Sequence, residues 1–127
     1  MKSFKNFGEL TSALAFDLID HLRAHDFGDD FELIADYGKS NQSCSAYVNF
    51  SLYDDESELV ADGKIRFSDH SDRHGSDVTI RIDGLISTVT DECGEYVETT
   101  MAEQDYEDSL QAAFAAAIKI SDQGRAQ

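Results

Sequence analysis

Two apolar stripes at helical spacing, one near each end of the chain, constrain the fold more than any other feature of this sequence. The first stripe recurs at three- and four-residue steps through about residue 24, at Phe7, Leu10, Leu14, Leu18 and Leu22. Asn6 followed by Glu9 fits a capping box in front of it, in which side chains satisfy free backbone N–H groups. Because such a stripe must be covered by another layer, the sequence predicts a packed helix over about 6–24.

The second stripe predicts a closing helix near 102–121. Its apolar positions are Tyr106, Leu110, Ala113, Phe114, Ala117 and Ile118. Thr100 with Glu103 fits another capping box, and the many alanines allow close approach to a sheet. We expect residues 122–127 to form a frayed tail, which leaves residues 1–121 as a single domain.

The segments between the two stripes alternate apolar and polar residues, the pattern of half-buried strands. These segments are 31–37, 46–53, 64–68 and 78–82. A last hairpin is expected from 85–90 and 95–101, around a turn at 91–94. No helical segment separates the strands, which favours antiparallel pairing. The predicted fold class is therefore α+β: a four- to six-stranded antiparallel sheet with the N- and C-terminal helices packed on one face.

Charge restricts the partners of this domain. Twenty-six acidic against ten basic residues give the 127-residue chain a net charge of −16. A globule of this length is about 35 Å across, and duplex DNA carries about one charge per 1.7 Å, so the two charge densities are of the same order. Direct binding to nucleic acid or to an anionic membrane needs Lys and Arg. We therefore expect this protein to bind neither nucleic acid nor a membrane directly. Solubility and adaptation to high salt are alternative reasons for the acidity.

The acids concentrate in two stretches, which are the candidate partner-binding residues. One is a loop at 54–58, and the other runs from 91 to 108 with no base. The candidates are Asp54, Asp55, Glu56, Glu58, Asp91, Glu92, Glu95, Glu98, Glu103, Asp105, Glu107 and Asp108. Clustering favours a binding face, and a merely solvated face is the alternative. Aromatic anchors for such a face are sought among Tyr47, Tyr53, Tyr96 and Tyr106, although Tyr106 also fits the core.

One cluster has the composition of a metal site: Asp69, His70, Asp72, His74 and Asp77. The two histidines lie between predicted strands, among glycine and serine residues typical of a turn. We therefore predict no metal and interpret the segment as a polar structural loop. A partner-contacting loop and a metal-dependent hydrolase remain the alternatives.

Other catalytic patterns are missing from the sequence. No serine has a nucleophile-elbow context, Cys44 has no local base to activate it, and no glycine-rich phosphate loop occurs. The sequence thus predicts a protein that is not an enzyme and needs no cofactor. No apolar run approaches the roughly 18 residues of a membrane span, and Cys44 and Cys93 are interpreted as reduced thiols, so we expect a cytoplasmic protein.

A short resemblance suggests a biological setting. The run KIRFSDH at 64–70, preceded by SAYV at 45–48, resembles small domains of phages and integrated elements. In composition the chain is similar to the DNA-mimic inhibitors that phages use against restriction and CRISPR–Cas systems. This resemblance implies an acidic inhibitor that binds the basic, nucleic-acid-binding surface of such a complex. A non-catalytic adaptor or assembly module of a mobile element is the alternative, and the oligomeric state stays open.

Overall fold

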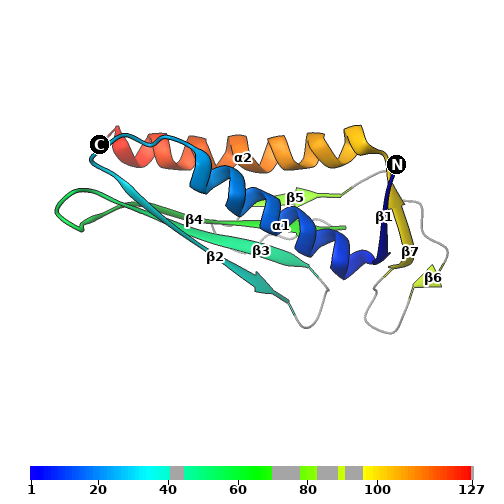
Figure 1. The fold of residues 1–127 in the computed structure, drawn as a ribbon. Coiled ribbons are helices and arrows are strands. Elements are labelled where there is room, and N and C mark those ends of the chain that lie inside the picture. Colours follow the sequence, from blue (N-terminus) through cyan, green and yellow to red (C-terminus); the bar gives the residue numbers. More distant parts are fainter. Residues whose placement is uncertain (41–44, 70–77, 83–88, 91–95, 127) are drawn as a thin grey trace.

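The computed structural model describes residues 1–40, 45–69, 78–82, 89–90 and 96–126. The fold is α+β, as predicted, and these residues form two helices and two sheets (Figure 1). In chain order the elements are β1 (Lys2–Asn6), α1 (Phe7–Ala24), β2 (Glu32–Lys39), β3 (Ala46–Tyr53), β4 (Leu59–Ser68), β5 (Val78–Arg81), β6 (Val89–Thr90), β7 (Tyr96–Met101) and α2 (Glu103–Arg125).

The larger sheet has the order β2-β3-β4-β5 and is mixed rather than wholly antiparallel. The β2–β3 and β3–β4 pairs are antiparallel, but β5 runs parallel to β4, with Ile65 opposite Val78 and Ser68 opposite Arg81. The prediction of an all-antiparallel sheet is wrong at this strand. An alternating pattern is the same in either direction, so the spacing of apolar residues in β5 could not distinguish the two pairings.

A second, three-stranded sheet of order β1-β7-β6 lies at the end of the molecule where both helices begin (Figure 1). Residues 85–88 and the turn at 91–94 of the predicted last hairpin lie outside the described residues, but its antiparallel pair is present, with Thr90 opposite Tyr96. It belongs to this separate sheet, however, because β7 pairs along its other side with β1, where Lys2 lies opposite Met101. The sequence analysis missed β1, whose five residues offer only Phe4 as a large apolar side chain.

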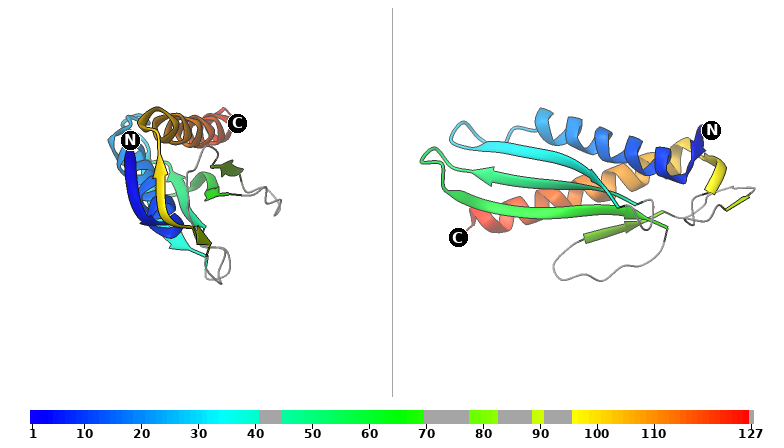
Figure 2. Two further views of the ribbon diagram at one scale, coloured as in Figure 1. Left: turned by 90° about the vertical axis from the view of Figure 1, so that its right-hand side faces the viewer. Right: turned by 90° about the horizontal axis from the view of Figure 1, so that it is seen from below.

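Both helices cover the same face of the larger sheet, which confirms that prediction (Figure 2). α1 lies against β2 and β3, and α2 lies against β4 and β5. Between them is the core, which includes Leu14 and Leu18 of α1, Phe50 of β3 and Phe67 of β4, all with at most 1% exposure. The face of the larger sheet away from the helices is called the open face below. No helix of the described residues is long and apolar enough to cross a membrane.

The two helix starts differ. α1 is capped as predicted, because the Asn6 side chain accepts a hydrogen bond from the Glu9 backbone N–H at 2.8 Å. The predicted capping box of α2 is wrong: Thr100 lies in β7, opposite Ser3, and the N-cap is Ala102, which makes no side-chain cap bond. Strand pairing has taken the threonine that the spacing assigned to a cap.

α2 also continues beyond the predicted end at 121, to Arg125. Its last turns are packed rather than frayed. Ser121 is fully buried, and the Arg125 guanidinium donates a hydrogen bond from Nη1 to the Phe27 carbonyl at 2.7 Å. Gly124 lies so close to β4 that an added Cβ would be 2.5 Å from the Val60 carbonyl oxygen. These contacts hold the end of α2 against the domain.

Candidate functional site

The acidic turn between β3 and β4 is shaped by one of its own carboxylates. Asp54 Oδ1 accepts hydrogen bonds from the backbone N–H groups of Glu56 and Glu58, both at 2.9 Å. Ser57 takes a left-handed backbone conformation, with a φ of 62°. Asp54 is partly buried, whereas Asp55, Glu56 and Glu58 are exposed. The turn therefore presents its outer carboxylates on a hydrogen-bonded backbone, and Asp54 serves chiefly to hold it.

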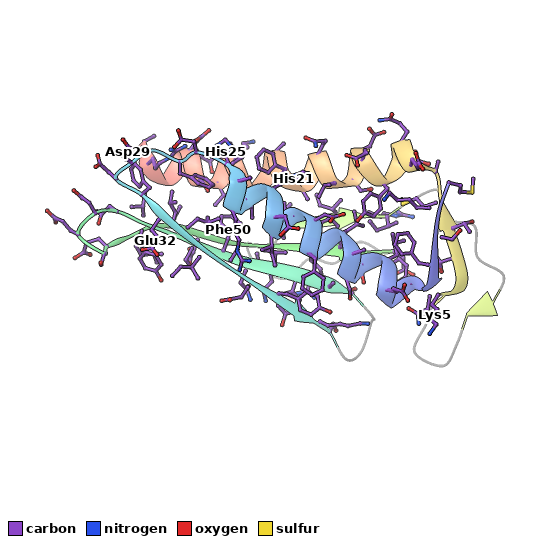
Figure 3. All side chains as sticks on the ribbon, viewed as in Figure 1. Lys5, His21, His25, Asp29, Glu32 and Phe50 are labelled. Carbon is purple, nitrogen blue, oxygen red and sulfur yellow. The ribbon has the colours of Figure 1, made fainter. Side chains whose placement is uncertain are left out.

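The connection from α1 to β2 adds carboxylates at the same end of the molecule. Asp29 and Asp30 are exposed in this connection, and Glu32 begins β2 directly opposite Tyr53, the residue before the acidic turn. Figure 3 shows Asp29 and Glu32 at this end. The sequence analysis did not include these three acids in its site. We call the group the turn end: Asp29, Asp30, Glu32, Asp54, Asp55, Glu56 and Glu58.

The second described acidic group lies in the first turns of α2. Glu103, Asp105, Glu107 and Asp108 are all exposed, and we call them the helix end. Asp108 Oδ1 accepts a hydrogen bond from Gln104 Nε2 at 2.8 Å, one turn earlier on the helix surface. Carboxylates are favourable at this position because the unpaired N–H groups of a helix start carry partial positive charge. Of the remaining predicted acids, Asp91, Glu92 and Glu95 lie outside the described residues, as does the side chain of Glu98.

The turn end and the helix end do not form one face. The helix end lies in the first turns of α2, whereas the last turns of α2 lie beside the turn end. The two groups therefore lie at opposite ends of the molecule (Figure 1). At 1.5 Å per residue, the 23 residues of α2 span about 35 Å. The candidate partner-binding residues that the structure describes thus form two separate acidic surfaces.

Tyr106 is a core residue rather than a partner anchor. It is 2% exposed, and its hydroxyl donates a hydrogen bond to Asp17 Oδ2, which joins α2 to α1. Burial, followed by the hydrogen bond and negative charge of Asp17, raises the pKa of the Tyr106 phenol far above its ordinary value. Lys2 and Phe4 of β1 contact the same ring, with Lys2 Nζ 4.5 Å from the ring centroid. Tyr106 therefore joins both helices to the smaller sheet.

Tyr47 and Tyr53 lie on the open face, and both are partly buried. The Tyr47 ring lies over Gly38 of the neighbouring strand, where an added Cβ would be 2.3 Å from Tyr47 Cε2. Lys64 Nζ lies 4.6 Å from the centroid of the same ring, within the range of a cation–π interaction. Tyr47 is thus engaged by its own domain, while the Tyr96 side chain lies outside the described residues.

Two pockets occur among the described residues near the end of α1. One has a volume of about 310 Å³ and is lined by Leu22, Arg23, His25, Asp26, Phe27, Gly28, Phe31, Glu32 and Leu33. The other, about 180 Å³, lies between the helices and is lined by His21, Ala24, His25, Gln111 and Phe114. Neither lining contains a serine, threonine or cysteine, so neither pocket supports nucleophilic catalysis through those residue types.

The predicted absence of a metal site stays a prediction. His70, Asp72, His74 and Asp77 lie outside the described residues, as do Cys44 and Cys93. Within the part of the chain that the structure describes, no group of three or more His, Cys, Asp or Glu side chains is placed to hold a metal ion.

Comparison with known proteins finds no matching family model, no matching curated protein and no matching solved structure. The resemblance to phage and mobile-element proteins therefore remains an expectation from the sequence.

Proposed function

We propose that this protein is a cytoplasmic, acidic inhibitor. It competes with nucleic acid for the basic surface of a bacterial defence complex, such as a CRISPR–Cas or restriction complex. The observation that carries the proposal is the placement of exposed carboxylates at both ends of one long helix. Lys and Arg side chains that contact phosphates would contact these carboxylates instead.

The separation of the two acidic ends supports a DNA-like arrangement. α2 spans about 35 Å, close to the length of one turn of B-DNA, about 34 Å. A surface that contacts phosphates one turn apart would therefore meet the turn end and the helix end together. The net charge of −16 would also steer the chain toward a basic partner and raise its association rate.

The backbone of both acidic ends is structurally ordered, which favours binding as well. The helix end belongs to a packed helix, and the turn end to a hydrogen-bonded turn beside a paired strand. Little backbone freedom is then lost when a partner binds, which lowers the free-energy cost of association. An acidic surface that serves only to keep the protein solvated does not require such an ordered backbone.

The test begins with affinity capture of the partner from a bacterial lysate, with identification by mass spectrometry. The affinity of the captured partner is then measured for two charge-reversed forms of this protein. They are Glu103→Lys/Asp105→Lys/Glu107→Lys at the helix end and Asp55→Lys/Glu56→Lys/Glu58→Lys at the turn end. We expect each to lose at least about tenfold in affinity, or about 1.4 kcal/mol. Binding should also weaken as salt rises, because exposed charges are screened over about 10 Å at 0.1 M, and duplex DNA should compete.

The control is Asp20→Lys/Asp62→Lys, two exposed acids of α1 and β4 that belong to neither end; because each test protein reverses three charges and the control two, the losses are compared per reversed charge. Asp17 is unsuitable as a control because it accepts the Tyr106 hydrogen bond. Equal losses from the control and the two test proteins, or binding that ignores both salt and DNA, would defeat the proposal.

The second candidate, a non-catalytic adaptor or assembly module, is favoured by exposed apolar side chains at one sheet edge. Phe16, Ile34 and Tyr37 are each at least 36% exposed. An adaptor that binds through this surface alone would keep its partner at high salt and in the presence of DNA, which separates the two functions in the same assay.

A further inference from the structure

β2 is an edge strand of the larger sheet. All eight of its residues, Glu32–Lys39, pair with β3 in continuous register. In the portion of the chain that the structure describes, no strand pairs with its other side. A long, regular edge presents a row of backbone N–H and C=O groups to which another strand can bind. One of the β2 carbonyls, that of Ala35, accepts a hydrogen bond from Arg23 Nη2 at 3.4 Å, and an added strand would have to replace this contact.

Apolar side chains flank this edge on both faces of the sheet. On the helix face, Phe16 of α1 stacks on Tyr37 with ring centroids 4.5 Å apart, and the Tyr37 hydroxyl lies 2.9 Å from Ser12 Oγ. Phe16 is 52% exposed in spite of this contact. On the open face, Ile34 is 48% exposed. An added strand would cover apolar surface with alternate side chains on both of its faces, which makes this edge suited to strand addition.

The charge next to this edge indicates what kind of strand would bind. Glu32 and Asp36 flank Ile34 along the open face, and both are exposed. Lys or Arg opposite them would form complementary cross-strand pairs. A second copy of this chain would instead bring further carboxylates to the edge, and each copy carries a net charge of −16. Charge complementarity therefore favours a basic strand of another protein.

We infer that the outer edge of β2, which pairs with no strand of the described residues, binds an extended, basic strand of the target, with apolar residues against Phe16, Tyr37 and Ile34 and with Lys or Arg against Glu32 and Asp36. The identity of that protein as the inhibited target rests on the proposed function. The edge and the turn end are continuous, because Glu32 belongs to both. A strand added to β2 would thus bring its basic side chains to the turn end.

The test uses the full chain, isotope-labelled for NMR, and the synthetic peptide acetyl-Thr-Val-Lys-Thr-Ile-Val-Lys-Thr-amide. Antiparallel to β2, this peptide can place its lysines opposite Asp36 and Glu32 and its isoleucine opposite Ile34. We expect the backbone amide signals of Glu32–Lys39 to shift and their hydrogen exchange to slow. Asp36→Lys should weaken binding at least about tenfold. The matched control Asp62→Lys, an exposed acid on the same face two strands away, should change it less than about twofold.

Three results would overturn the inference. The first is no change in the β2 amides at millimolar peptide. The second is equal binding by a peptide with glutamate in place of lysine, since charge would then play no part. The third is a concentration-dependent dimer of the free chain, seen by sedimentation and lost in Ile34→Lys, which would show that a second copy occupies the edge.

Failure of this inference is distinguishable from failure of the proposed function. If the helix-end and turn-end reversals leave target binding unchanged while the peptide still binds β2, the inhibitor proposal fails and the edge site stands. If the reversals weaken target binding while the peptide leaves β2 unchanged, the acidic ends stand and the edge site fails.

Discussion

The substitution Gly124→Ala sets helix propensity against packing in the last turn of α2. Alanine is favoured over glycine in a helix interior by about 1 kcal/mol. Against this, the added Cβ would lie 2.5 Å from the Val60 carbonyl oxygen and 2.6 Å from Ala61 Cβ. Since the first of these is a backbone atom, no side-chain rotation can relieve the overlap, and α2 or β4 must move.

The packing cost should exceed the propensity gain. Overpacking of this kind costs about 1–3 kcal/mol, while the gain falls short of its full value so close to the end of a helix. We expect a net loss of about 1–2 kcal/mol in the free energy of unfolding. With an unfolding entropy of about 2.1 cal/mol/K per residue, this loss lowers the Tm of the 127-residue chain by about 4–8 °C.

Thermal and urea denaturation, followed by circular dichroism, measure the effect. Gln123→Ala is the control, because Gln123 is exposed on the same turn of α2, and its stability should stay within about 0.5 kcal/mol of the parent. Arg125 follows Gly124 and donates to the Phe27 carbonyl, so hydrogen exchange near the end of α2 should quicken in Gly124→Ala alone. A higher Tm for Gly124→Ala would refute the close approach of α2 to β4.

Three further substitutions test the core. Tyr106→Phe should cost about 1–3 kcal/mol at neutral pH through loss of its bond to Asp17. Because the folded state raises the pKa of Tyr106, the unfolded chain loses this proton first, so parent stability should fall above about pH 10 by up to about 1.4 kcal/mol per pH unit. Urea unfolding at pH 7–11 should show a shallower decline for Tyr106→Phe, and equal slopes would contradict the assignment. Leu14→Asp should abolish cooperative thermal unfolding, because Leu14 is fully buried. Phe114 is partly exposed, so Phe114→Asp should only lower the Tm. A cooperative thermal transition of Leu14→Asp within a few degrees of the parent would refute this assignment.

The helices and β3 could be predicted because their burial follows from their own residues. The stripe from Phe7 to Leu22 is buried as its spacing requires, and β3 has the predicted bounds. The end of α2 could not be predicted in this way. Few apolar residues mark its last turns, and Gly124 is favourable there only because β4 lies against it. A glycine that ends many helices here permits one to continue.

Strand partners and directions depend on distant parts of the chain, which local patterns do not describe. β1 has one large apolar residue, Phe4, and is ordered by pairing with β7 near the other end of the sequence. β5 runs parallel to β4 although the two strands are consecutive in the sequence and no helix is predicted between them. Thr100 fits a capping box by its spacing but lies opposite Ser3 in β7. In each case tertiary pairing decided what local sequence left open.

The same distinction governs the acidic surfaces. The sequence indicated which acids are exposed but not which of them gather. Pairing of Glu32 with Tyr53 brings the α1–β2 connection to the acidic turn, while the length of α2 separates that turn from Glu103–Asp108. A compact basic patch can contact only one of these ends, whereas a surface that follows one turn of a duplex can contact both along the length of α2, about 35 Å. Comparable affinity losses from the helix-end and turn-end reversals would therefore indicate an extended, DNA-binding partner surface, and a loss from one set alone would indicate a compact patch and argue against imitation of a duplex.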